Sequence, residues 1–451
     1  MLPEKFLERM RGLLKDDYPA FLLALEGDAV KGCRINRMKL PSGGEDMPFL
    51  GAALPYYSGG FLLDSDVQIG RTPEHHAGMI YVQDPGAMCT LGAIDIQDDW
   101  WVADLCAAPG GKSSQAAEHL KEGFLLSNEF VPKRAKITVG NLERLGARRA
   151  MVTSLDTGEL AEMFEGVFDL VIADAPCSGE GMFRKSEEAK EEWSEENVLA
   201  CAKRQSYILD NAAGMVKDGG YLLYSTCTYS CEENERAVLS FLERNPQFSI
   251  SPVKEELRAV TCDGYPQADL DNHGIEHTRR FYPHRSPGEG QYLALLKKRD
   301  DGKAGRICYK EKTTLPSKDE QRIVGDFFRE NLIKAPEGRL IKNGDTIVLI
   351  QHGCPIPQRG VFMSGIAVGE IRGKLLVPHH QLFSALGDHF KVKIDLSESL
   401  AEKYLLGEEI GTDSTHRGYC VLTYRSVAIG GGKISDFRIK NHYPKGLRNN
   451  R

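Results

Sequence analysis

Two cysteines stand where an apolar run of the chain gives way to a polar turn. Cys177 follows the run 168–173 and is introduced by Asp174, and Cys227 follows the run 220–225. A single cysteine at such a place is usually just a small buried hydrophobic residue. Two cysteines at equivalent places, one of them after an Asp-Ala-Pro sequence, are hard to explain by packing and indicate thiol chemistry at a shared pocket.

A thiolate beside a carboxyl group suits the methylation of carbon 5 of cytosine. This carbon is a poor nucleophile until a thiolate adds to carbon 6 and pushes electron density towards carbon 5. The ring must gain a proton at N3 as the adduct forms, a task for a carboxyl group such as that of Asp174. After methyl transfer the carbon-5 proton is removed and the thiol is eliminated, which a second cysteine can assist. Position alone does not decide whether Cys177 or Cys227 is the nucleophile.

A glycine pair follows an earlier apolar run, 101–105. Gly110 and Gly111 would allow a close approach of the backbone to a ligand, and the small residues before them leave room for a bulky one. Alone, the pair is better explained as a tight structural turn. The turn does not follow the GxGxxG pattern and contains no phosphate-binding P-loop, so S-adenosylmethionine fits it better than a nicotinamide or ATP. The candidate cofactor loop comprises Cys106, Ala107, Ala108, Pro109, Gly110, Gly111 and Lys112.

Two acidic residues follow the next two apolar runs. Glu129 comes after the run 123–128, where a carboxylate can accept hydrogen bonds from both hydroxyls of a ribose. Asp156 comes shortly after the run 150–153 and could accept from the amino group of adenine. Simpler explanations exist, because an isolated Glu129 would be a surface carboxylate, and Asp156 alone is better explained as a helix cap or turn residue.

Short apolar runs alternate with helical patterns from residue 101 onwards. This alternation is typical of an α/β domain with a largely parallel sheet, in which ligands bind at the carboxyl ends of the strands. The candidate residues would then gather at one edge of one sheet. The predicted strands are 101–105, 123–128, 150–153, 168–173, 220–225 and 292–296.

The composition is that of a soluble intracellular protein. Of the 451 residues 41% are hydrophobic and 27% are charged. No apolar run approaches the ~20 residues that span a bilayer, and residues 1–5 lack the pattern of a secretion signal. The 11 cysteines show neither the spacing of a disulfide framework nor a CxxC pair. We therefore expect reduced thiols, a cytoplasmic location, no membrane association and no metal.

The net charge of -7 argues against nucleic-acid binding only if the charge is spread evenly. Acids crowd into the stretch 187–196, whereas in the final stretch the cations face a single acid, Asp436. A locally basic end could contact RNA, although a solvated tail would have the same composition. The cations are Lys433, Arg438, Lys440, Lys445, Arg448 and Arg451.

Several motifs together resemble the NOL1/NOP2/Sun family of RNA cytosine-5 methyltransferases. The resemblance covers residues 81–298, roughly half of the chain. It implies a class I, Rossmann-like methyltransferase fold with S-adenosylmethionine as cofactor. It also implies that Cys227 attacks carbon 6 and that Cys177 promotes release of the product. The matching segments are 81–85, 105–112, 174–179, 224–228, 280–284 and 288–290.

The same resemblance assigns the cofactor pocket. The cofactor loop, Glu129, Asp156 and Asp174 would surround S-adenosylmethionine, and Asp174 would serve the base as well. DNA cytosine-5 methyltransferases use the cysteine of their Pro-Cys motif instead, so the family resemblance, and not spacing, selects Cys227 as the nucleophile. Cys231 is an extra thiol to which no role is assigned.

The end of the chain resembles the PUA-like RNA-binding module of bacterial RsmF-type ribosomal RNA methyltransferases. Segments 430–433 and 440–448 carry this resemblance, and their aromatic and basic residues suit base stacking and phosphate contact. It implies that the substrate is small-subunit (16S) ribosomal RNA, or the small ribosomal subunit, bound by an expected monomer. Two alternatives stay open. A transfer-RNA cytosine-5 methyltransferase would share the catalytic half, and a noncatalytic RNA-binding ribosome-assembly factor would need neither cysteine.

Four parts are expected along the chain. They are an N-terminal RNA-binding lobe (1–92), an S-adenosylmethionine-dependent methyltransferase domain (93–300), a C-terminal α+β domain (301–385) and a PUA-like RNA-binding domain (386–451). A polar, glycine-containing stretch at 298–312 is predicted to link the second part to the third.

Overall fold

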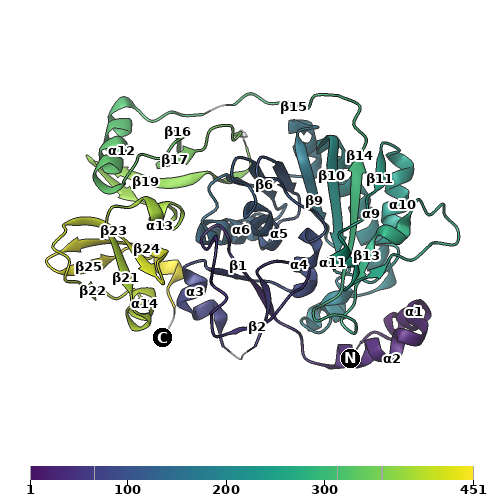
Figure 1. The fold of residues 1–451 in the computed structure, drawn as a ribbon. Coiled ribbons are helices and arrows are strands. Elements are labelled where there is room, and N and C mark those ends of the chain that lie inside the picture. The colour runs from purple at the N-terminus through teal and green to yellow at the C-terminus, as the bar shows by residue number, and fades with distance from the viewer. Residues whose placement is uncertain (1, 65–66, 312, 357–358, 450–451) are drawn as a thin grey trace.

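A ten-stranded sheet with a parallel centre forms the middle of the molecule (Figure 1). The computed structural model describes residues 2–64, 67–311, 313–356 and 359–449. The strands of the sheet are β5 (Trp101–Asp104), β6 (Phe124–Asn128), β7 (Ala150–Thr153), β9 (Phe168–Asp174), β10 (Val216–Thr226), β11 (Phe248–Ile250), β12 (Cys262–Asp263), β13 (Arg279–Phe281), β14 (Gln291–Lys298) and β18 (Val361–Ser364). Their order is β12-β13-β14-β10-β9-β5-β6-β7-β18, with β11 paired to β14. The strands from β10 to β7 are parallel, and β14 and β18 are antiparallel to their neighbours.

All six strands predicted from the sequence lie in this sheet, and the predicted α/β fold class is confirmed. The apolar runs are continuous because both faces of the sheet are covered. On β9, Val171 and Ala173 face one hydrophobic core, whereas Leu170 and Ile172 face the other. The first core contains residues of α7 (Thr157–Met163), α9 (Glu195–Met215) and α10 (Glu235–Arg244). The second contains residues of α4 (Pro85–Leu91), α5 (Gly111–Ala117), α6 (Pro132–Leu145) and α11 (Glu255–Arg258).

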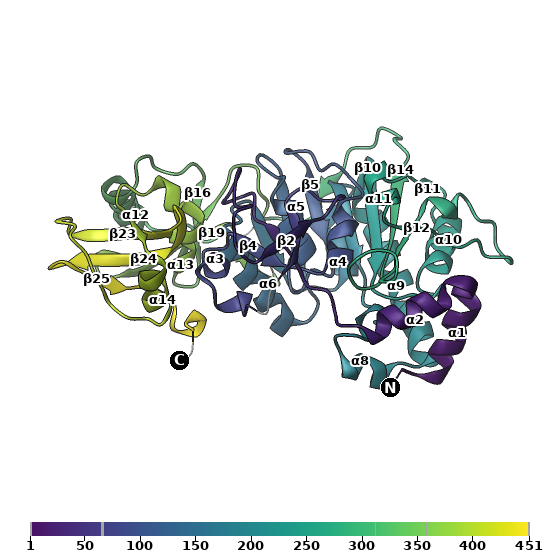
Figure 2. The ribbon, with the colours of Figure 1, turned by 60° about the horizontal axis from the view of Figure 1, so that its bottom comes forward.

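The N-terminal lobe begins with two helices that pack far from the C-terminal end of the molecule (Figure 2). Phe6, Met10 and Leu14 are buried against Phe183 and Trp193, which explains their helical spacing. A four-stranded sheet of order β2-β3-β1-β4 follows. The lobe contains α1 (Glu4–Leu14), α2 (Tyr18–Glu26), β1 (Gly32–Ile35), β2 (Leu50–Ala53), β3 (Gly60–Leu63), α3 (Pro73–His76) and β4 (Ile80–Val82).

Two further sheets follow the central one along the chain. The first has the order β16-β17-β19-β20 and the second has the order β21-β23-β24-β25-β22. The elements of the first are α12 (Lys318–Asn331), β16 (Arg339–Asn343), β17 (Thr346–Ile350), β19 (Ile366–Arg372), β20 (Leu375–Pro378) and α13 (His380–Leu386). Those of the second are β21 (Lys393–Leu396), α14 (Glu398–Leu405), β22 (Ile410–Gly411), β23 (Gly418–Tyr424), β24 (Val427–Ser435) and β25 (Arg438–Asn441).

Several contacts tie the parts together in ways that the sequence does not reveal. Strand β18 belongs to the segment 301–385 but pairs with β7 of the central sheet. In the linker, β15 (Arg306–Ile307) pairs with β8 (Phe164–Glu165). The second C-terminal sheet shares one hydrophobic core with the N-terminal lobe and another with α12 and β17. The division into four parts therefore stays a prediction, since cores and sheets cross its boundaries.

The remaining elements are short. They are α8 (Glu187–Glu192) and the 3-10 turns η1 (Lys15–Asp17), η2 (Ile69–Arg71), η3 (Glu180–Met182), η4 (Ile275–His277), η5 (Gly387–His389) and η6 (Lys445–Leu447). Within the described ranges, no helix is both long and apolar enough to cross a bilayer. Of the cations at the end of the chain, Arg451 lies outside the described residues.

Candidate active site

The two cysteines singled out in the sequence lie side by side. Because β9 and β10 are parallel neighbours with Asp174 opposite Ser225, the turns that follow them meet at one edge of the sheet. The Sγ atoms of Cys177 and Cys227 are 3.3 Å apart, and both residues are partly exposed. The contact with Cys227, together with burial, raises the pKa of Cys177 well above its ordinary value. Cys177 therefore keeps its proton and can donate it in a hydrogen bond to the Cys227 sulfur.

A carboxylate at the end of the strand before Cys177 is held by three donors. The Nζ atom of Lys112 lies 2.8 Å from Oδ2 of Asp174. The hydroxyl of Ser225 donates to Oδ1 at 2.6 Å, and the amide of Gln291 donates to the same oxygen at 3.4 Å. Burial alone would lower the pKa of Lys112, but the charge of Asp174 and its hydrogen bond outweigh burial and raise it. Lys112 is thus the proton-bearing member of the pair.

The candidate cofactor loop is fastened to the neighbouring elements by its backbone. The N–H of Ala107 donates to the carbonyl of Asn128 at the end of β6, at 2.8 Å. Helix α6 contributes Asn141, whose Nδ2 donates to the carbonyl of Pro109 at 2.8 Å. Gly110 has φ 110°, in the region where a side chain would be strained. The loop therefore ends in a turn that needs glycine, as its glycine pair predicts.

The N-terminal lobe supports the helix that follows this loop. Arg34 of β1 is fully buried and forms an ion pair with Glu118. Its Nη2 donates to the carbonyl of Gly111 at 3.2 Å and to the hydroxyl of Ser114, and its Nε donates to Gln83 at 3.0 Å. A buried guanidinium is stable only with such a set of acceptors. The lobe is therefore part of the scaffold of the site.

Three carboxylates give the loop an acidic surrounding. Burial raises the pKa of Asp104 to about 7, with the charge of Asp174 acting in the same direction. Its Oδ2 accepts from Ser113 at 2.7 Å, while its buried Oδ1 has no hydrogen-bond partner among the described residues. Burial and the charges of Asp104, Asp174 and Glu129 raise the pKa of Cys106 well above its usual range. An acidic pocket with an unpartnered acceptor fits a cationic ligand that carries N–H or O–H donors, as S-adenosylmethionine does.

Glu129 and Asp156 follow β6 and β7, as expected, but their surroundings differ. Glu129 is buried and accepts from the N–H of Val131 at 3.0 Å, and its Oε2 lies 3.3 Å from Arg134. Asp156 caps α7, accepting from the N–H of Gly158 at 2.8 Å and from the hydroxyl of Tyr207 at 2.6 Å. The simple explanation of Asp156 as a helix cap is therefore correct for Oδ1. No hydrogen bond or ion pair joins Asp156 to the other candidate residues in the described part of the chain.

Glu180 connects the turns that carry the two thiols, and sequence reasoning missed it. Its Oε1 accepts from Nε1 of Trp193 at 2.8 Å and from the hydroxyl of Ser230 at 2.6 Å. Its Oε2 accepts from the hydroxyl of Thr228 at 2.9 Å and from the N–H of Tyr229 at 2.8 Å. The side chain is buried. Its place three residues after Cys177 was visible in the sequence, but its four donors were not.

Glu233 holds the turn of Cys177 from the other side and was also missed. It accepts from the N–H of Ser178 at 3.0 Å, from the hydroxyl of the same residue at 2.5 Å and from Gln205 at 2.8 Å. Burial raises the pKa of Glu233 to about 7. In addition, the N–H of Gly181 donates to the carbonyl of Cys227 at 2.8 Å, so the two turns are also joined directly.

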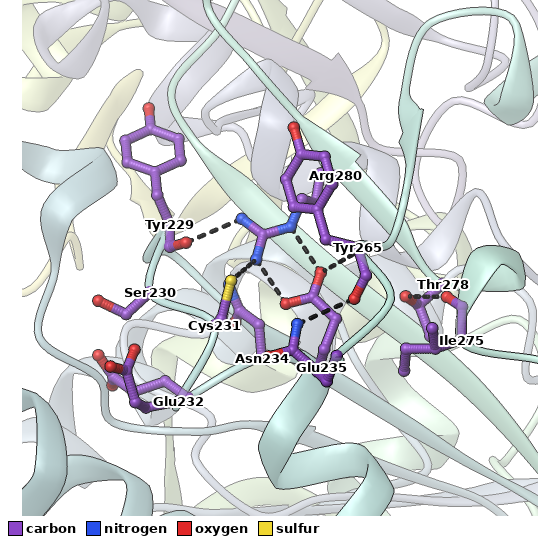
Figure 3. A network of polar contacts seen from close by, with 12 residues as sticks. Tyr229, Ser230, Cys231, Glu232, Asn234, Glu235, Tyr265, Ile275, Thr278 and Arg280 are labelled. Atoms are coloured by element: carbon purple, nitrogen blue, oxygen red, sulfur yellow. Dashed lines mark hydrogen bonds and ion pairs between the residues drawn. The ribbon is translucent and has the colours of Figure 1, made fainter. Parts of the chain in front are cut away.

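A buried ion pair between β13 and α10 supports the turn after Cys227 (Figure 3). The guanidinium of Arg280 donates to both carboxylate oxygens of Glu235, at 2.6 and 2.5 Å. It also donates to the carbonyl of Tyr229 at 2.8 Å and to Sγ of Cys231 at 3.5 Å. Burial raises the pKa of Cys231 to about 11. The extra thiol thus belongs to this support. Within the described residues, no hydrogen bond joins its sulfur to the thiol pair.

Within the residues that the structure describes, no group of three or more His, Cys, Asp or Glu side chains could hold a metal ion. The candidate site comprises two thiols, the Asp174–Lys112 pair and the acidic surroundings of the cofactor loop. Such a set can perform nucleophilic attack by sulfur and proton transfer on a bound ring.

Three successive parts of the chain match family models. Residues 92–297 match "16S rRNA methyltransferase RsmB/F", residues 2–85 match "N-terminal domain of 16S rRNA methyltransferase RsmF", and residues 391–449 match "Methyltransferase RsmF PUA domain". These matches confirm the fold class that the sequence predicts. It combines a Rossmann-like methyltransferase domain with a small N-terminal lobe and a PUA-like domain.

Individual relatives agree with the family models. "Ribosomal RNA small subunit methyltransferase F" of Vibrio vulnificus is 29% identical over 475 residues, covering 99% of this chain and 97% of that protein. A solved methyltransferase homolog from Pyrococcus horikoshii is 26% identical with a TM-score of 0.57, over 66% of this chain and 95% of that one. NSun6 from Pyrococcus horikoshii, solved with SFG, shares the fold with 19% identity and a TM-score of 0.55, over 66% of this chain and 99% of that one. With these parts in this order, the chain belongs to the RsmB/F family of 16S rRNA methyltransferases.

Proposed function

We propose that the protein methylates carbon 5 of a cytosine in 16S ribosomal RNA through a covalent adduct between Cys227 and carbon 6. The observation that carries this proposal is the thiol pair, with Sγ atoms 3.3 Å apart, at the same sheet edge as the Asp174–Lys112 ion pair. A methyltransferase that acts on an already nucleophilic nitrogen or oxygen would need no thiol. The match to small-subunit methyltransferases over nearly the whole chain favours ribosomal over transfer RNA.

The first step is the attack of the Cys227 sulfur, as thiolate, on carbon 6 of the ring. As the C6–S bond forms, the ring takes up a proton at N3. Lys112 donates to Asp174, so the pair offers both a proton and an acceptor at one place. This arrangement refines the expected role of Asp174, because the proton for N3 would come from the pair and not from an isolated carboxyl group. Ser225 fixes the carboxylate through its 2.6 Å hydrogen bond.

The cofactor loop, Asp104, Glu129 and Asp174 would hold S-adenosylmethionine, which supplies an electrophilic methyl group. The carboxylates favour a cationic ligand, and the unpartnered Oδ1 of Asp104 can accept a donor from it. Asp156 would contribute through its second oxygen, since Oδ1 is engaged in the cap of α7. Cofactor use and the assignment of these residues are parts of the proposal.

Release follows once carbon 5 carries the methyl group. A base such as a water molecule takes the proton on carbon 5, the electron pair re-forms the C5–C6 double bond, and the C6–S bond breaks with Cys227 leaving as a thiolate. N3 returns its proton to the Asp174–Lys112 pair. Cys177 retains its proton, because the contact with Cys227 and burial raise its pKa. It can therefore stabilise the leaving thiolate through an S–H···S hydrogen bond. Without this donor the adduct should persist.

Two substitutions test the proposal, with methyl transfer and covalent complex formation as the measured quantities. Cys227→Ala should abolish methyl transfer and give no covalent complex with the target RNA. Cys177→Ala should form a complex with RNA that survives denaturing electrophoresis, because attack proceeds while release is slowed. Bisulfite sequencing of RNA from cells with and without the protein identifies the cytosine that loses its methyl group.

The control is Cys308→Ala, since Cys308 is exposed in the linker, directly after strand β15. This variant should methylate at the normal rate and form no persistent complex. A trapped adduct in Cys227→Ala together with loss of methyl transfer in Cys177→Ala would show that the roles of the thiols are reversed. Absence of an adduct in Cys177→Ala alone would contradict the release role of Cys177. Cytoplasmic location and a monomeric state stay predictions.

A further inference from the structure

A large cavity lies at the edge of the central sheet opposite to the thiol pair. It has a volume of about 570 Å³ and is lined by the turns that precede β6 and β7 and by the loop after β17. The thiols and the cofactor loop follow the carboxyl ends of the strands instead. Because a strand rises about 3.3 Å per residue, the length of β6 separates the two edges by on the order of 15 Å. We call this hollow the sheet-edge cavity, and it is distinct from the candidate active site.

Basic side chains line the sheet-edge cavity, and two of them have no partner. Arg37 is paired with Glu45 at 2.7 Å. Arg149 donates only to backbone carbonyls, including that of His352 at 3.0 Å. Across the described ranges, the side chains of Lys121 and Arg148 show no hydrogen bond or ion pair. The cationic lining residues are Arg37, Lys121, Arg148 and Arg149.

The acids of the cavity do not balance this charge. Glu118 is engaged in the buried ion pair with Arg34. Glu337 pairs with Lys334 at 2.9 Å, outside the set of lining cations. Of the lining acids, only Glu122 then remains to offset the charges of Lys121, Arg148 and Arg149 among the described residues. The cavity therefore carries an excess of positive charge and attracts an anion.

Arg148 is the residue most suited to such an anion. It is half-buried, and burial lowers its pKa, while Asp388 of a small adjoining hollow acts in the opposite direction without reaching ion-pair distance. A partly desolvated guanidinium without a partner gains more from an anion than a fully hydrated one does. Its planar fork fits the two free oxygens of a phosphate.

The positive charge continues from the cavity towards the C-terminal sheets. The pKa of His389 is lowered by burial and then by the charge of Arg148, with Lys393 and Lys334 acting in the same direction. Among the described residues Arg148 and Lys393 have no ion-pair partner, whereas Lys334 pairs with Glu337. Figure 1 shows α13 between α6 and the sheet of β23 and β24. The hollow that shares Arg148 with the cavity is also lined by Ser384 and Ala385 of α13 and by Val427 and Ala428 of β24, so the cavity adjoins the PUA-like domain.

We propose that the sheet-edge cavity binds the phosphodiester backbone of the RNA substrate, with Arg148 and Lys121 contacting phosphates. This inference rests on the proposed function, which makes RNA the substrate. An RNA bound at the PUA-like domain would lie next to this cavity, because the hollow that shares Arg148 with it is also lined by Val427 and Ala428 of β24. The cavity would then add affinity and fix the orientation of the RNA without touching the reacting base.

The test measures RNA affinity against salt concentration for Lys121→Ala, Arg148→Ala and the double variant, with a 16S rRNA transcript. Each lost phosphate contact should reduce the slope of log affinity against log salt by about one, and the double variant should bind about tenfold more weakly at low salt. Titration with S-adenosylmethionine should give unchanged affinity for all three. Lys121 is exposed, so its removal leaves the fold intact.

Arg244→Ala provides a matched loss of charge elsewhere. Arg244 is exposed on α10, paired with Asp210, and its removal should leave the salt slope unchanged. Unchanged affinity and slope in the double variant would overturn the inference. If the unsubstituted protein bound no RNA, the proposed function itself would fail. Binding of AMP that Arg148→Ala abolishes, with RNA binding unaffected, would assign the cavity to free nucleotides and also overturn it.

Discussion

The proposed reacting groups are held by buried carboxylates that act as acceptors for the turns around them. Glu180 receives two donors on each oxygen, and Glu233 receives three donors in all. Together they fix the turn that carries Cys177 and the turn that carries Cys227. A thiol pair at 3.3 Å depends on this support, because each turn alone could place its sulfur elsewhere. The positions of the two sulfur atoms are thus fixed by residues that take no part in the proposed reaction.

Sequence reasoning reached the reacting groups but not their supports. Cys177, Cys227 and Asp174 could be predicted because each stands at a strand end, where parallel strands bring ligands together. Glu180 and Glu233 could not, since a carboxylate is buried only where donors from distant segments surround it. In the sequence such a residue has the same surroundings as one on the surface.

Replacing Glu180 by glutamine tests this support at a single atom. Either orientation of the new amide puts an NH2 group against a backbone or indole N–H, of Tyr229 or Trp193. One buried donor is left unsatisfied, which should lower the free energy of unfolding by about 1–3 kcal/mol. Methyl transfer under single-turnover conditions should slow more than RNA binding weakens, since the turns shift relative to each other. Chemical denaturation measures the free energy of unfolding, and a rapid-quench assay measures the rate of methyl transfer.

Glu187→Gln is the matched control for this prediction. Glu187 is exposed on α8 and pairs only with Lys190. A surface ion pair of this kind contributes less than about 1 kcal/mol, so stability and rate should remain near those of the unsubstituted protein. Equal behaviour of the two variants would contradict the role given to Glu180.

At the level of elements, the central strands were predictable and the sheet edges were not. The parallel strands are covered on both faces, and they therefore appear in the sequence as apolar runs that end in polar turns. The edge strand β18 carries no such signal. It pairs with β7, which lies far away in the sequence, and of its side chains Met363 is buried while those of Val361, Phe362 and Ser364 are only partly buried. Pairings of this kind depend on the whole fold.

The ion pair between Arg280 of β13 and Glu235 of α10 holds the turn after Cys227 in place. We expect the contributions of these two side chains to stability to depend strongly on each other. The side chains are 2% and 0% exposed, and the guanidinium contacts both carboxylate oxygens. Arg280→Lys loses this two-pronged geometry and leaves a poorly matched buried charge. The loss of stability should be about 3–5 kcal/mol, as for other broken buried pairs. Urea unfolding measures it.

A double-mutant cycle separates the pair from its surroundings. In Arg280→Met with Glu235→Gln neither charge is left unpaired, so the double variant should be more stable than the sum of the single losses predicts, by about 1–3 kcal/mol. Additive losses would mean that the two side chains contribute independently. In that case the turn after Cys227 would be fixed mainly by Glu180.

At the scale of the whole molecule, the basic end of the chain is a docked domain and not a solvated tail. Strands β24 and β25 pair with each other, and Tyr443 is buried against the N-terminal lobe, where its hydroxyl lies 2.6 Å from Nδ1 of His76. Gly430 and Gly431 pack against aromatic rings. A truncation at residue 430 would therefore remove a central strand, and its effect on RNA binding would not separate contact from folding.

Point substitutions on the exposed face of β24 and β25 test the RNA-binding role without this difficulty. Lys433 lies opposite both Tyr419 of β23 and Lys440 of β25, so an aromatic ring and two cations adjoin one another across three strands. The ammonium group of Lys433 lies 5.3 Å from the centre of the Tyr419 ring. This combination suits a stacked base flanked by phosphates.

Replacing both lysines by alanine should weaken binding of the 16S transcript several-fold and reduce the salt slope by about two, since each side chain would release one counterion. The thermal midpoint and the affinity for S-adenosylmethionine should not change, because both side chains are exposed and far from the thiol pair along the chain. Arg372→Ala, which removes an exposed cation paired with Glu370 in the neighbouring sheet, is the control. An unchanged salt slope in the double variant would exclude this face of the PUA-like domain from RNA contact and would place the RNA on another surface of the molecule.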